Sequence, residues 1–192
     1  MTKNKKKFIV SIIGAIIIFL LGITYISMPT YYGIDLMENI EINNLFISFA
    51  IIYATINLGT FLMIGKNPNN ESINLCIVGS IVGILNIILS NFTDKSFMIS
   101  FAILVFLITA VKLFTVDYYH DRKDAYYYIE GLCLCIFFIV GLVTALNLFG
   151  SSFLQTMMLG FFITIMGILK IFNISIKTML KSKRFLRKIK LK

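Results

Sequence analysis

The chain alternates long apolar stretches with short polar connections. Each stretch is close in length to the roughly 20 residues that an α-helix needs to cross the hydrocarbon core of a bilayer. A transmembrane barrel would have shorter segments of alternating polarity, so the pattern predicts an all-α membrane protein. We expect six transmembrane helices arranged as three helical hairpins, over residues 8–64, 73–115 and 127–174. The predicted spans are Phe8–Ser27, Leu45–Ile64, Ile73–Asn91, Ser96–Thr115, Tyr127–Phe149 and Phe153–Ile174.

The composition supports this class. Hydrophobic residues make up 58% of the 192 positions and charged residues 14%, while the mean hydropathy is +0.90. A soluble domain needs a more polar surface than this composition provides. Residues 1–7 are basic and precede the first apolar run, as in a signal peptide, but the run is long and no small-x-small cleavage site follows. We therefore expect an uncleaved first span.

The distribution of positive charge predicts the orientation. Of the 18 Lys and Arg residues, only Lys95 falls on the side opposite the N-terminus. By the positive-inside rule, we expect both termini to lie in the cytoplasm. The chain is then a multi-pass protein of the plasma membrane or inner membrane. The longest outside connection is predicted at Met28–Asn44. Since the net charge of +9 follows from topology, it does not indicate a nucleic-acid partner.

An internal repeat is predicted from a shift of 58 residues. The shift places Ile81–Gly83 on Ile139–Gly141 and Thr109–Phe114 on Gly167–Phe172 without a gap, and it pairs Lys112 with Lys170. A weaker match relates Ser48–Ala50 to Ser100–Ala102. The repeated unit is a helical hairpin.

Small residues recur at four-residue spacing, which lets transmembrane helices approach closely. Packing within one bundle is favoured over a dedicated dimer face, although a homo-oligomer remains open. The glycines that we expect at helix contacts are Gly79, Gly83, Gly141, Gly160 and Gly167.

Two of these glycines, Gly160 and Gly167, form a motif together with Gly14, Gly22 and Pro29. On these residues the chain resembles the HdeD-like acid-resistance membrane proteins over Phe8–Ile174, and the closest stretch is Ala110–Phe114, the polar connection to Tyr128 and the fifth helix. The resemblance implies a six-helix bacterial inner-membrane protein linked to acid stress, with no catalytic residues to carry over.

Lys112 and Glu130 are the candidates among the ionisable residues within predicted spans, where charge is costly and often functional. Lys112 is near the end of the fourth span and Glu130 near the start of the fifth, at similar depth. They are candidates for an intramembrane ion pair or an ion route, whereas snorkelling of both side chains to the interface is the simpler arrangement. Asn57, Asn86 and Asn147 lie deeper within their spans. We expect them either to form hydrogen bonds between helices or to line a polar cavity.

Catalytic and metal-binding motifs are scarce, and we expect neither enzymatic activity nor a cofactor. His120 is the single histidine, and together with Asp117 and Asp121 it is a conceivable metal group, but a solvated charged loop is the favoured interpretation. The cysteines fall inside predicted spans and are expected to be packing residues: Cys76, Cys133 and Cys135.

The C-terminal tail, residues 175–192, is basic and lacks acidic residues. Its apolar positions near helical spacing predict a helix on the inner membrane surface, and a disordered tail that only enforces orientation is an equal alternative. Contact with anionic lipid is expected at Lys181, Lys183, Arg184, Arg187 and Lys188.

Three roles follow from these patterns. The resemblance favours a non-enzymatic part in acid or membrane stress tolerance. The repeated hairpins and intramembrane charges are also typical of a small transporter or channel subunit. An accessory subunit that binds another membrane protein is the third alternative.

Overall fold

The computed structural model describes residues 3–37, 41–64, 70–93, 95–122, 126–146 and 152–190. Within these ranges the chain forms helices and no strands. All six helices contain a segment that is long and apolar enough to cross a membrane. The chain is therefore an all-α, multi-pass membrane protein, which confirms the predicted fold class. The helices are α1 (Lys3–Met37), α2 (Ile42–Ile64), α3 (Glu71–Ser90), α4 (Ser96–Asp121), α5 (Tyr126–Leu146) and α6 (Ser152–Lys190).

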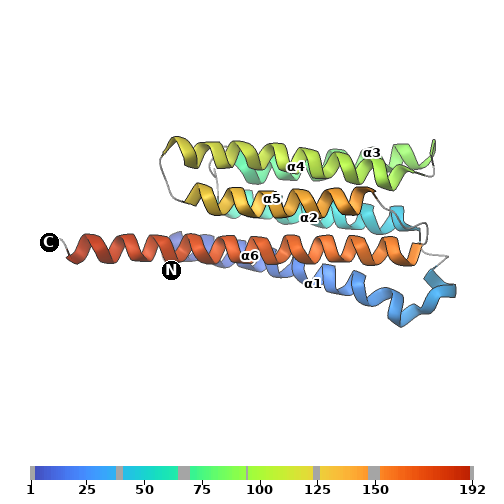
Figure 1. The fold of residues 1–192 in the computed structure, drawn as a ribbon, viewed down its shortest axis with the longest axis horizontal. Coiled ribbons are helices and arrows are strands. Elements are labelled where there is room, and N and C mark those ends of the chain that lie inside the picture. Colours follow the sequence, from blue (N-terminus) through green and yellow to red (C-terminus); the bar gives the residue numbers. More distant parts are fainter. Residues whose placement is uncertain are drawn as a thin grey trace.

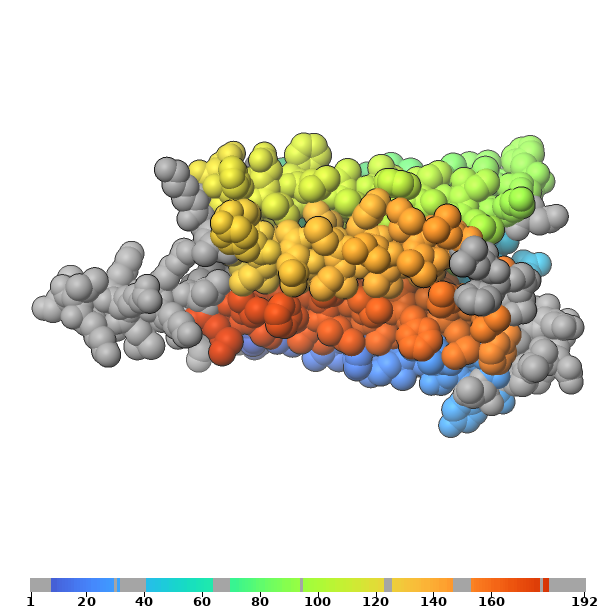
Figure 2. Space-filling view, in the orientation of Figure 1, coloured from blue at the N-terminus to red at the C-terminus, as the bar shows by residue number. Residues whose placement is uncertain are grey.

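The helices form a closed bundle. Each one packs on the next along the chain, and α6 returns to pack on α1, while α2 also touches α4 and α6. Figure 2 shows α4, α5, α6 and α1 side by side on one face. The closest pairings join α1 to α6 and α2 to α3, across the boundaries of the predicted hairpins. Both described ends of the chain lie at the same end of the bundle, which we call the terminal end (Figure 1).

Two helices are longer than predicted, and α1 corrects our assignment of Pro29 to a loop. Pro29 lies inside α1, which continues to Met37 through most of the predicted outside connection. Because proline has no N–H to donate and its ring crowds the preceding turn, it bends a helix rather than ending it when packing holds both sides. Figure 1 shows α1 bending near its C-terminal end. Pro68 is outside the described residues.

The helix α6 continues as one element to Lys190, beyond the predicted span and into the tail (Figure 1). Similarly, α4 reaches Asp121, so His120 lies in the last helical turns and not in the loop that the sequence suggested. Charged and polar residues with good helix propensity can extend a span past the hydrocarbon core, which hydropathy alone does not detect.

Phenylalanine rings fill the middle of the bundle. The ring of Phe101 on α4 lies 4.8 Å from that of Phe162 on α6 and 6.0 Å from that of Phe46 on α2, measured between centroids. Phe137 on α5 packs on Phe162 at 5.3 Å. All four side chains are buried, and they join four helices in one apolar layer.

The predicted orientation has a direct test that uses exposed residues at the two ends. Asn91 follows α3 at the end opposite the termini, and Arg122 follows α4 at the terminal end. We expect a cysteine at Asn91 to react with an impermeant thiol reagent added to intact cells, and one at Arg122 to react only after lysis. Reaction at Arg122 alone in intact cells would show that the orientation is the opposite one. Reaction at both positions would contradict the arrangement with six spans.

Candidate functional site

A lysine between two carboxylates lies inside the terminal end of the bundle. The Nζ atom of Lys112 on α4 is 2.7 Å from Oε1 of Glu71 on α3 and 3.1 Å from Oε1 of Glu130 on α5. Both distances allow charge-assisted hydrogen bonds. We call Glu71, Lys112 and Glu130 the ionic cluster, and it connects three consecutive helices.

The second oxygen of Glu130 is also bonded. Asn173 on α6 donates its side-chain amide to Oε2 of Glu130, and the Tyr126 hydroxyl donates to Oδ1 of Asn173. Each partner thus orients the next, and a fourth helix joins the ionic cluster. Such a chain of hydrogen bonds holds a carboxylate in one position and compensates for its removal from water.

The helix ends explain why the carboxylates lie here. Glu71 is in the first turn of α3, where the helix dipole favours a negative charge. The preceding residue, Asn70, has φ 54°, a left-handed conformation that asparagine tolerates better than most residues and that redirects the chain into α3. Glu130 is one turn into α5. Since α3 and α4 run in opposite directions, α5 begins at the same end of the bundle as α3.

Burial distinguishes the ion pair from snorkelling. The side chain of Glu130 is 4% exposed, that of Glu71 21% and that of Lys112 27%. Lys112 is nine residues before the end of α4, a rise of about 13 Å. Its ammonium group points to the carboxylates inside the bundle, an arrangement that differs from the snorkelling alternative.

Three residues of the site were not singled out as site residues in the sequence: Glu71 within the ionic cluster, and Tyr53 and Asn173 beside it. Tyr53 on α2 is buried and its hydroxyl interacts electrostatically with Lys112 and Glu71. Lys170 on α6, which the predicted repeat pairs with Lys112, is half-buried, interacts electrostatically with Lys112 and Glu71, and makes no ion pair with any described residue. The order of the helix ends placed Glu71 at the end of the bundle where α4 finishes, but it did not identify Glu71 as a partner of Lys112.

The predicted packing glycines lie at helix contacts of different tightness. A Cβ at Gly160 or Gly167 would meet the α1 backbone at 2.7 Å, at Ile26 and Phe19. One at Gly141 would meet Val105 on α4 at 2.7 Å. On α3, a Cβ at Gly79 would be 3.2 Å from the Ala50 carbonyl, and one at Gly83 would make ordinary contact at 3.4 Å.

Gly22 on α1 is the tightest of these positions. In the sequence it stood out only as a motif residue of the family resemblance and not as a helix contact. A Cβ there would meet the backbone nitrogen of Thr164 on α6 at 2.4 Å. Gly22, Gly160 and Gly167 together allow α1 and α6 to approach until their backbones touch. This contact explains why the first and last helices form the closest pairing.

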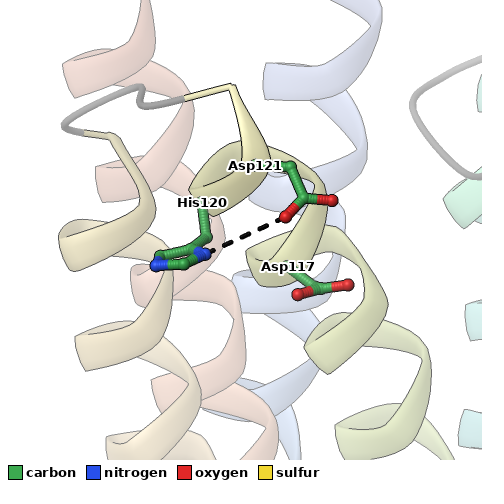
Figure 3. Close-up of side chains that lie close together, drawn as sticks. All are labelled: Asp117, His120 and Asp121. Carbon is green, nitrogen blue, oxygen red and sulfur yellow. Dashed lines mark ion pairs between the residues drawn. The ribbon is translucent and has the colours of Figure 1, made fainter.

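Asp117, His120 and Asp121 lie together on the last turns of α4 (Figure 3). One ligand atom from each falls within 4.8 Å of the others, and Nδ1 of His120 is 4.0 Å from Oδ1 of Asp121. All three side chains are exposed, so water competes with any ion for them. The group lies on a solvated helix end and not in the predicted loop, and metal binding by these residues stays untested.

The remaining predicted polar residues divide between local and interhelical bonds. Asn57 donates to the carbonyl of Tyr53 in its own helix, whereas Asn86 reaches the carbonyl of Asn43 on α2 at 3.5 Å. Asn147 is outside the described residues. The cysteines are unpaired thiols, with Cys133 buried, Cys76 half-buried and Cys135 exposed.

From residue 180 onward the basic tail is described only by its backbone, which is helical to Lys190. The side chains of Lys181, Lys183, Arg184, Arg187 and Lys188 are outside the described part, so their contact with anionic lipid stays a prediction.

Comparison with known proteins finds no family model, no curated protein and no solved structure that matches the chain. The resemblance to the HdeD-like family accordingly remains an expectation from the sequence.

Proposed function

We propose that this multi-pass membrane protein is a small transporter or channel subunit, without enzymatic activity, in which the ionic cluster binds a proton or a small cation. The observation that carries the proposal is the bridging position of Lys112 between Glu71 and Glu130 inside the bundle. Ionisable groups facing the interior of a transmembrane bundle are costly to retain and commonly mark ion or proton pathways.

The chemistry of the ionic cluster suits an exchangeable cation. Two carboxylates share one ammonium group, and the Lys170 ammonium nearby adds a second positive charge that acts on Lys112. When all four residues are ionised, their formal charges cancel. A proton or cation that reaches the carboxylates can therefore take the place of the Lys112 ammonium group without leaving an uncompensated charge. This exchange requires Lys112 to move toward solvent, and its side chain is already 27% exposed.

The test is ion flux in lipid vesicles that contain the purified protein. With an imposed gradient of H⁺, Na⁺ or K⁺, we expect one of these cations to equilibrate faster than in empty vesicles. Glu130→Gln keeps the shape of the side chain and removes its charge, so it should slow that flux about tenfold or more if the carboxylate binds the cation. Glu41→Gln is the matched control, since Glu41 is exposed at the opposite end.

The variants must first have melting temperatures that allow reconstitution. Equal fluxes for the wild type and Glu130→Gln would contradict a role of the ionic cluster, and fluxes equal to empty vesicles for all three cations would contradict transport of these cations.

A second proposed role is acid or membrane stress tolerance, which the family resemblance implies. The feature that favours it is the dependence of Lys112 on two carboxylates, because acid protonates carboxylates and removes the charges that hold the ammonium group. Cells that lack the protein should survive less well at low pH and equally well at neutral pH. The wild-type chain should restore survival, and a chain carrying Glu71→Gln and Glu130→Gln should not.

A further inference from the structure

A second group of polar side chains, three of them buried and one half-buried, lies at the end of the bundle opposite the termini. It consists of Asn43 on α2, Asn86 on α3, and Ser96 and Ser100 on α4. Asn86, Ser96 and Ser100 have no exposed surface. The hydroxyl of Ser96 donates to Oδ1 of Asn43 at 2.9 Å, and Nδ2 of Asn86 donates to the Asn43 carbonyl at 3.5 Å. We call these four residues the opposite-end polar site.

Two oxygens of this site have no hydrogen-bond partner among the described residues. Neither Oδ1 of Asn86 nor Oγ of Ser100 makes a hydrogen bond in the part of the chain that the structure describes, although both atoms are buried. The contact of Nδ2 with the Asn43 carbonyl also fixes the orientation of the Asn86 amide, because a carbonyl can only accept. Buried polar atoms without a partner are uncommon and point to an additional ligand.

The two oxygens lie at the same depth. Asn86 is four residues before Ser90, where α3 ends, and Ser100 is four residues after Ser96, where α4 begins. The two helices are antiparallel and pack on each other, so these side chains are placed at equal distances from the turn that joins them. Asn86 bonds Asn43, and Ser100 lies one helical turn after Ser96, which also bonds Asn43, so the two oxygens border the same region of the bundle.

We propose that the opposite-end polar site binds a water molecule, which donates to Oδ1 of Asn86 and exchanges a hydrogen bond with Oγ of Ser100. Water offers both a donor and an acceptor, as this pair of atoms requires. A cation fits less well, since none of the four residues is acidic and two helices, α2 and α4, begin here with the positive ends of their dipoles. The proposal is independent of the proposed transport function.

The sign of a stability change tests it. If water bridges the two residues, Ser100→Ala breaks the bridge and leaves Asn86 unpaired, so we expect the melting temperature in detergent to fall by about 2–4 °C. If the site is dry, Ser100→Ala removes an unpaired buried hydroxyl and the melting temperature should stay or rise. Ser48→Ala is the matched control, because the Ser48 hydroxyl is exposed and bonds the Asn44 carbonyl of its own helix.

A double substitution locates the water between the two residues. Asn86→Leu and Ser100→Ala should together cost less than the sum of the two single changes, because either one already displaces the shared water. Additive effects would show that the residues act separately and would overturn the proposal, as would a raised melting temperature for Ser100→Ala.

Discussion

Lys112→Ala is expected to be the most destabilising single change in the ionic cluster. It leaves the carboxylates of Glu71 and Glu130 in a buried site without the ammonium group that lies within 3.1 Å of both. Removing one partner of a buried ion pair typically costs about 3–5 kcal/mol, because the remaining charge is neither solvated nor paired. For a chain of this length the melting temperature in detergent should fall by about 10 °C.

The other members of the ionic cluster should follow in a defined order. Glu130→Ala should cost less than Lys112→Ala, because Lys112 keeps Glu71 at 2.7 Å. The double variant should lose less than the sum of the single changes, since the pair has already been broken once. Lys95→Ala is the control, as Lys95 is exposed at the opposite end, and it should leave the melting temperature unchanged. Strict additivity of Lys112→Ala and Glu130→Ala would mean that the two residues do not interact.

Gly22→Ala and Gly167→Ala should each force α1 away from α6. The added methyl groups would meet backbone atoms at 2.4 Å and 2.7 Å, and backbone cannot rotate away as a flexible side chain can. Overpacking of this kind costs about 1–3 kcal/mol or more. Thermal unfolding in detergent measures the loss, and cross-linking between cysteines placed on α1 and α6 measures the separation.

Two other glycines provide matched controls for this prediction. Gly59 on α2 and Gly131 on α5 have open space where a Cβ would be. Alanine there should be neutral or stabilise the protein by about 0.5–1 kcal/mol, because glycine is a poor helix residue. If alanine at Gly22 were as harmless as at Gly59, the close approach of α1 and α6 would be wrong.

The ionic cluster was partly predictable. Lys112 and Glu130 stand out because ionisable residues are rare in apolar spans, and their similar depth followed from the positions of the helix ends. Glu71 and Asn173 do not stand out in this way. Glu71 lies just before the predicted third span, and asparagine near a span end is common, so only the packing of α3 and α6 against α4 and α5 identifies them as partners.

The sequence by itself determined the class of this protein, the number of its spans and several of the glycines at contacts between helices, because hydropathy and small-residue spacing are local properties of each helix. The extent of α1 past Pro29 and of α6 to Lys190 depended on the structure, since hydropathy reports the apolar part of a helix and not its ends. The tertiary structure alone decided that α1 pairs with α6, that Lys112 bridges two carboxylates, and that two buried oxygens at the opposite end find no partner among the described residues. Each of these depends on which faces of distant segments meet, and a closed bundle brings together residues whose separation along the chain carries no such information.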